Sequence, residues 1–182
     1  MRRKSFDFIM TGVGALLTVA LFAAAGLATW GASFTGSTVH DQLAAQKIYF
    51  PAQGSAALAS PEIGPYLNQY AGEQMTTGAQ AEAWANHFIA VHLKEIGGGL
   101  TYSQLSGKAM ADPTNTQLAT QVQLMFRGET LRGLLLNAYA FSIFGVMAGY
   151  AAVVCYILGA IMLLLTLLGL LHARMTDPNQ TL

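Results

Sequence analysis

The chain has 182 residues, of which 53% are hydrophobic and only 10% are charged, against about 25% charged residues in an average soluble domain. Nine basic and nine acidic side chains give a formal net charge of zero, which argues against nucleic acid as a partner because its binding needs concentrated Lys and Arg. The single cysteine, Cys155, excludes a disulfide framework within one chain. These numbers favour a membrane protein.

The N-terminal segment predicts a first membrane-spanning helix. Residues 1–7 form a charged tail with Arg2, Arg3 and Lys4, and residues 8–34 carry no charge. This run is longer than the apolar core of a signal peptide, so we expect an uncleaved anchor. Positive charges flanking a span stay in the cytoplasm, which places the N-terminus there.

Residues 35–133 predict a small, mostly helical extracytoplasmic domain between two spans. Residues 38–47 extend the first helix outward, whereas residues 48–70 form a looping segment because three prolines interrupt them. Two capping-box patterns then mark helix starts, Thr77 to Gln80 and Thr101 to Gln104. They predict helices that end near residues 96 and 111.

The helix over residues 78–96 is amphipathic. In a regular helix its apolar residues share one face, and His92 lies in the middle of that face. His92 is then either a core histidine satisfied by a hydrogen bond or a ligand-binding, pH-sensitive group. Trp84, Phe88 and His92 form a candidate ligand pocket that faces the proline-rich segment.

Asp112 and Pro113 predict the N-cap and first position of one long helix, from residue 114 to residue 171. From Gly133 to Leu171 this helix has no Asp, Glu, Lys, Arg or His. Such a run reaches roughly 58 Å, against about 30 Å of hydrocarbon. We therefore place the second span at residues 148–171 within the apolar segment 134–171, and a cytoplasmic tail at residues 172–182.

The outer part of that apolar run extends beyond the hydrocarbon of the membrane, so its apolar side chains must pack against protein. We predict a partner surface on the long helix, formed by Leu134, Leu135, Tyr139, Phe141 and Phe144.

Small residues predict where helices approach each other. The first span has an alanine ladder at intervals of four, and the second has a Gly-x-x-x-Gly pattern. Small residues at this spacing let helix backbones come close in lipid, either between the two spans or against a partner. The candidate packing residues are Ala20, Ala24, Ala28, Ala32, Gly145 and Gly149.

Candidate chemistry is sparse. His40, just beyond the first span, is a candidate axial ligand for a haem or chlorophyll-type pigment, or else a polar interface residue. His87 and His92 are five residues apart, whereas a zinc-binding helix needs a spacing of four, so we predict no metal site. The spans lack central ionisable residues, which argues against a self-contained pump or channel.

Three stretches together resemble a known protein family: VHDQLAAQKIYFP (39–51), YAGEQMTTGAQAEAWANHFIAVHL (70–93) and FRGETLRGLLLNAYAF (126–141). The chain is similar over most of residues 1–172 to two-span membrane proteins of actinobacterial type, which often carry the label aromatic ring-opening dioxygenase-like. The resemblance implies the two-span topology. The label implies a non-haem iron site of two histidines and a carboxylate.

The sequence thus predicts an all-α protein of the bacterial inner membrane with both termini in the cytoplasm. We expect a non-catalytic accessory subunit without its own cofactor that packs against other integral membrane subunits and lipids, in a respiratory or photosynthetic complex. The alternative is a membrane-anchored extracytoplasmic module that binds or senses a ligand. A third hypothesis is an iron-dependent enzyme.

Overall fold

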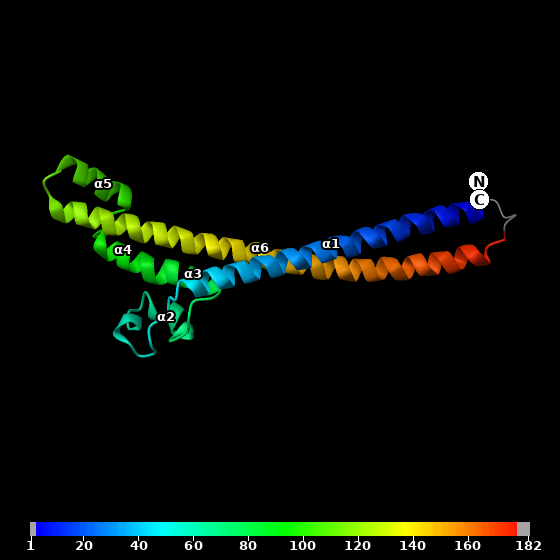
Figure 1. Cartoon of the computed structure of the whole chain (residues 1–182), viewed down its shortest axis with the longest axis horizontal. Helices are drawn as coiled ribbons and strands as arrows, with labels where there is room; N and C mark the ends of the chain where they lie inside the picture. The colour runs from blue at the N-terminus through cyan, green and yellow to red at the C-terminus, as the bar shows by residue number, and fades with distance from the viewer. Residues whose placement is uncertain (1–2, 178–182) are drawn as a thin grey trace. The chain divides into compact units, whose positions relative to one another are not determined.

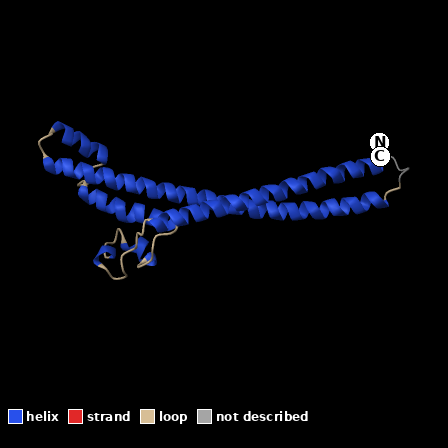
Figure 2. Cartoon of the chain, viewed as in Figure 1, coloured by secondary structure: helices blue, strands red, loops and turns tan. Residues whose placement is uncertain are grey.

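The computed structural model describes residues 3–177, so the predictions for Arg2 and for residues 178–182 lie outside the described residues. Within the described range every regular element is a helix, and the only β pairing is an isolated bridge between Tyr49 and Gln74 (Figure 2). The predicted all-α fold with two long apolar helices is confirmed.

Figure 1 shows the helices in chain order. The two long helices are α1 (Arg3–Ala45) and α6 (Thr116–Met175). Four shorter α-helices lie between them in sequence: α2 (Gly64–Leu67), α3 (Gly78–Trp84), α4 (Ala90–Ile96) and α5 (Tyr102–Ala111). The same stretch contains two short 3-10 helices, η1 (Ala56–Leu58) and η2 (Asn68–Tyr70), and a π-helical turn, η3 (Ala85–Ile89). The chain divides into two compact units. The paired-helix unit contains residues 3–34 and 144–177, and the helical unit is Thr35–Ile143.

In the paired-helix unit α1 and α6 run antiparallel along a seam of small side chains. A Cβ added to Gly14 would lie 2.7 Å from the Thr166 hydroxyl, and one added to Gly149 would lie 3.9 Å from the Ala32 Cβ, so the backbones approach closely. Successive seam residues are separated alternately by three and by four positions along each helix, which is the seven-residue period of a left-handed coiled coil. On α1 they are Thr11, Gly14, Thr18, Leu21, Ala25, Ala28 and Ala32, and on α6 Gly145, Ala148, Ala152, Cys155, Gly159, Met162, Thr166, Gly169, Ala173 and Thr176.

This period corrects the predicted alanine ladder. Ala28 and Ala32 are partly buried in the seam, but Ala20 and Ala24 are exposed, and Ala25 is the fully buried alanine. Each step of four residues turns about 40° too far around a helix, so a four-residue ladder leaves the contact face after two steps. Gly145 and Gly149 do lie on the contact face.

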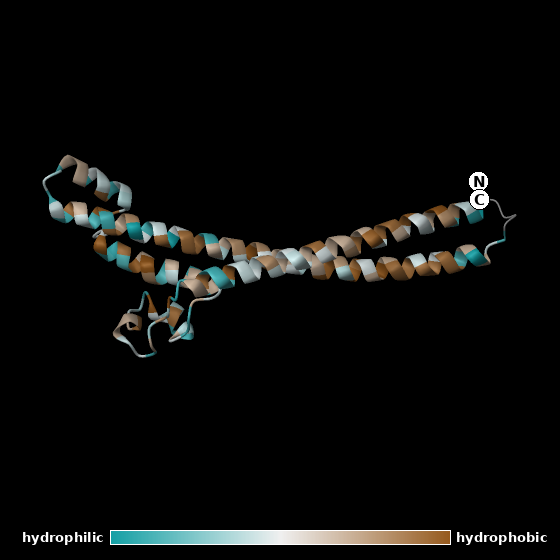
Figure 3. Ribbon diagram, in the orientation of Figure 1, coloured by the Kyte–Doolittle hydropathy of each residue, from teal (hydrophilic) through white to brown (hydrophobic). Residues whose placement is uncertain are grey.

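The large apolar side chains of this unit point outward. In the most apolar window of each helix only 11% of the residues are buried, and brown, hydrophobic residues follow both helices through this unit (Figure 3). Both helices are long and apolar enough to cross a membrane. The core helix of a soluble protein would bury such a surface, so low burial distinguishes these helices from one.

The helical unit folds the proline-rich segment onto α3. The backbone N–H of Phe50 donates to Glu73 O at 2.8 Å and that of Met75 to Ile48 O at 2.8 Å, which closes the loop. Leu67 and Met75 are fully buried in the main core. Both predicted capping boxes are confirmed, at Thr77 with Gln80 and at Thr101 with Gln104.

The π-helical turn changes which residues of the 78–96 stretch face the core. The N–H of Ala90 bonds to Ala85 O, five residues back, so one extra residue is accommodated and the later positions shift by one. Leu93 is therefore buried, and His92 is exposed. The prediction that His92 lies in the middle of the apolar face is wrong for this reason.

Two boundaries also differ from the predictions. Helix α6 begins at Thr116, and the Asn115 side chain accepts the Leu118 N–H at 3.1 Å, so Asn115 takes the capping position predicted for Asp112. The helical unit extends to Ile143, ten residues beyond its predicted end at residue 133. The outer part of the long apolar run therefore belongs to this unit.

Candidate binding groove of the helical unit

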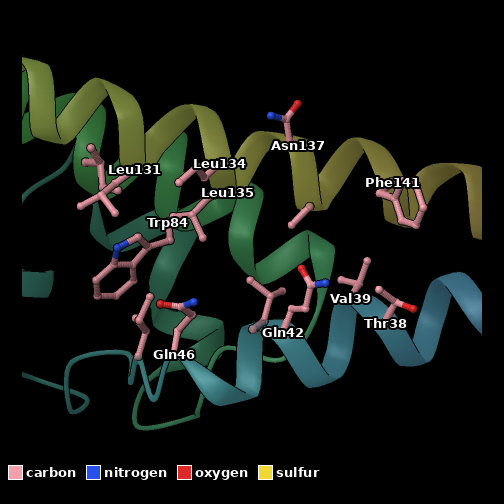
Figure 4. Close-up of a pocket in the computed structure, with 14 residues that line it drawn as sticks. Thr38, Val39, Gln42, Gln46, Trp84, Leu131, Leu134, Leu135, Asn137 and Phe141 are labelled. Carbon is pink, nitrogen blue, oxygen red and sulfur yellow. The ribbon is translucent and has the colours of Figure 1, made fainter.

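An apolar groove of about 540 Å³ lies within the helical unit (Figure 4). One wall is the last part of α1 with the residues after it, the other is the first half of α6, and α3 and the π-helical turn contribute Trp84 and Ile89. The lining residues are Thr38, Val39, Gln42, Leu43, Gln46, Ile48, Trp84, Ile89, Leu131, Leu134, Leu135, Asn137, Ala138 and Phe141.

The core holds the groove in shape. Val39 and Leu43 of α1 and Leu135 of α6 are buried in the main core cluster, so both walls are anchored from behind. Trp84 stacks on Phe88 with ring centroids 4.2 Å apart and meets Phe50 edge to face at 5.1 Å. Because its ring is fixed by these contacts, the groove is preformed.

Polar groups line the groove without formal charge. They are the hydroxyl of Thr38 and the side-chain amides of Gln42 and Gln46, whereas the amide of Asn137 points away from α1 (Figure 4). None of these amides makes a hydrogen bond to another group within residues 3–177. No Asp, Glu, Lys, Arg or His lines the groove, so it offers amide donors and acceptors to an uncharged group and supplies no strong acid or base.

Two predicted sites merge in this groove. Trp84, from the predicted ligand pocket, and Leu134, Leu135 and Phe141, from the predicted partner surface, all line it. Leu134 is 60% exposed and Phe141 is 45% exposed, so residues 3–177 leave this part of the predicted partner surface open.

The other predicted residues of those two sites lie elsewhere. Phe88 is behind Trp84, and the exposed His92 donates a hydrogen bond from Nδ1 to Phe88 O at 2.7 Å. The backbone of Tyr139 lies close to Gly78, where an added Cβ would be 3.2 Å from the Tyr139 Cα. Phe144 belongs to the paired-helix unit.

Sequence reasoning missed the α1 wall, because residues 38–47 were predicted only as an outward extension of the first helix and were given no binding role. The sequence nevertheless contains a pattern that points to these residues. Val39, Gln42 and Gln46 continue the three-and-four spacing of the α1 seam, so the same helix face continues into the groove. Extending the seven-residue period past the span would have found them.

The histidines of the helical unit lie apart from the groove. His40 is exposed and its Nδ1 lies 3.1 Å from Asp41 Oδ1, and the His87 ring stacks on Tyr66 with centroids 3.5 Å apart. Within residues 3–177 no three His, Cys, Asp or Glu side chains gather as a metal site.

Comparison with protein-family models, with curated proteins and with solved structures gave no match.

Proposed function

We propose that this chain is a two-span protein of the bacterial inner membrane, with the helical unit on the extracytoplasmic side and both termini in the cytoplasm. The outward-facing apolar residues of α1 and α6 support membrane insertion, since lipid would cover them. Arg3 and Lys4 at the start of α1, and Arg174 at the end of α6, support the orientation because cytoplasmic flanks carry the positive charges.

Three of the threonine hydroxyls in the seam, those of Thr11, Thr18 and Thr176, fit that environment, whereas the buried hydroxyl of Thr166 has no hydrogen-bond partner among residues 3–177. Thr11 donates to Asp7 O and Thr18 donates to Gly14 O, each at 2.8 Å, so these hydroxyls are satisfied inside their own helix. In lipid an unsatisfied polar group would cost several kcal/mol, which this bonding avoids.

We further propose a non-catalytic accessory role in a larger membrane complex, with a respiratory or photosynthetic assembly as the host class. The observation that carries this proposal is that small and bulky side chains lie on different faces of the helices in the paired-helix unit. Gly, Ala and Thr make up most of the internal seam, while most of the bulky Leu, Ile, Phe and Val face outward and can dock on partner spans. His40 is the residue that we would test for contact with a host haem or pigment, since it is exposed and next to the apolar part of α1.

Photo-crosslinking tests the accessory role. A benzophenone side chain at Phe144, which is exposed in the paired-helix unit, is expected to capture one integral membrane protein that also co-migrates with the chain in mild detergent. The same group at the exposed Ser103 of α5 is the control and should capture none. A chain that elutes alone, with crosslinks only to lipid, would contradict the accessory role.

The second candidate is a membrane-anchored binding or sensing module. It is favoured by the groove, whose volume and mixed apolar and polar lining are in the range of small-molecule sites. An iron-dependent oxygenase, in contrast, finds no supporting observation among the described residues.

A further inference from the structure

We propose that the groove binds the acyl chain of an uncharged lipid of the diacylglycerol type, with its hydroxyl and ester head group at Gln42 and Gln46. The proposal rests on the membrane insertion argued above, but it does not depend on the accessory role.

The dimensions of the groove suit one lipid chain. Its α6 wall extends from Leu131 to Phe141, eleven residues of helix with about 15 Å between the first and the last. In Figure 4 Trp84 lies toward one end of the groove and Phe141 toward the other, with leucines of α6 along one side. The volume of about 540 Å³ falls within the roughly 300–1,000 Å³ of small-molecule pockets.

The charge of the groove selects an uncharged head group. An anionic phospholipid would be held by Lys or Arg, and none lines the groove. Arg132 follows directly after Leu131, but its guanidinium donates to Asn86 Oδ1 at 3.1 Å and to Glu129 Oε2 at 3.4 Å. The amides of Gln42 and Gln46 can instead donate to ester carbonyls and accept from a hydroxyl.

The same two glutamines disfavour a partner helix as the occupant. Gln42, on α1, and Gln46, just after its end, stand where the three-and-four spacing of the seam continues, and a docking helix would need apolar contacts there. A helix satisfies its own backbone groups, so it could pair these amides only through polar side chains, and an apolar helix would bury them unpaired at a cost of about 1–3 kcal/mol for each group. A lipid head group satisfies them.

Tryptophan emission provides the test, because the chain has only two tryptophans, Trp30 and Trp84. In the Trp30→Phe variant the remaining tryptophan is Trp84, which lines the groove. Bromine atoms quench tryptophan at short range, so we would reconstitute the purified full chain in phosphatidylcholine nanodiscs that contain diacylglycerol with brominated chains. Brominated phosphatidylglycerol at equal mole fraction serves as the charged comparison, and a brominated decyl quinone as the other uncharged amphiphile.

We expect saturable quenching of Trp84 by the brominated diacylglycerol, and at most weak quenching by the brominated phosphatidylglycerol. Leu134→Gln should weaken the apparent affinity roughly tenfold, because it removes apolar contact in the groove. Leu124→Gln is the matched control on the same helix, since Leu124 is also exposed but lies outside the groove, and it should leave quenching unchanged.

Gln42→Leu with Gln46→Leu separates head-group recognition from chain burial. It should reduce the preference for diacylglycerol over phosphatidylglycerol while leaving the fold intact, because both glutamines are exposed. Equal quenching by both lipids in the parent chain, stronger quenching by the quinone, quenching unaffected by Leu134→Gln, or no quenching at all would each overturn the proposal. These outcomes leave the crosslinking test of the accessory role unaffected, so the two proposals can fail separately.

Discussion

Replacing Leu67 by alanine is expected to destabilise the helical unit by about 2–5 kcal/mol. Leu67 is fully buried among Phe50, Leu58, Ile63 and Met75 in the main core, and α2 is only four residues long, so it cannot move to refill the space. The cost contains the lost burial of the side chain and the cavity left behind. For a unit of this size the melting temperature should fall by roughly 10 °C or more.

Thermal unfolding of the Trp30→Phe chain in detergent, followed by Trp84 emission, measures this effect. Leu124→Ala makes the same substitution on an exposed leucine of α6 and should change the melting temperature by only a few degrees. If both substitutions shift it equally, Leu67 is not a core residue and the description of this unit is wrong.

The second large effect is expected in the seam, where Ala25→Leu should separate the two long helices and Ala24→Leu should not. Ala25 is fully buried and Ala24 is exposed, although the residues are neighbours in the same helix. Added volume in a close-packed contact costs about 1–3 kcal/mol, which is about 5- to 150-fold in the pairing equilibrium.

The formation of a disulfide between α1 and α6 measures how well the two helices pair. A Cβ on residue 14 would lie 3.7 Å from the Thr166 Cβ, within the range of disulfide geometry. In a Cys155→Ser chain, Gly14→Cys with Thr166→Cys should therefore crosslink readily under mild oxidation. Ala25→Leu should slow the crosslinking, while Ala24→Leu should not. The opposite order would favour the four-residue ladder over the seven-residue seam.

Local signals made much of the fold predictable. Two capping boxes identified helix starts because each satisfies backbone donors with side chains a few residues away, and hydropathy identified the long helices because their apolar runs are so extended. The capping position at Asn115 was missed because Asp112 and Pro113 offered an equally good local pattern. The π-helical turn was missed because periodicity analysis assumes a regular helix, and this assumption placed His92 in the core.

The groove could be predicted only in pieces. Trp84 was predicted to line a ligand pocket and Leu134 to belong to a partner surface, but their meeting depends on tertiary packing across fifty positions of sequence. Gln42 and Gln46 were overlooked because polar residues at the end of a span resemble an ordinary connector. The seam shows the same limit, since the face that α1 buries is set by the three-and-four spacing of its partner as well as by its own alanines.

The central claim is that the two long helices cross a membrane with the helical unit outside and the termini inside. Single cysteines in a Cys155→Ser chain test it, at Ser5, Ser103 and Met175, all of them exposed residues. A membrane-impermeant maleimide applied to intact cells stripped of their outer barrier should label Ser103→Cys alone. It should label Ser5→Cys and Met175→Cys only after the membrane is opened. Labelling of all three in sealed cells, protection of Ser103→Cys, or recovery of the chain in the soluble fraction would contradict the account.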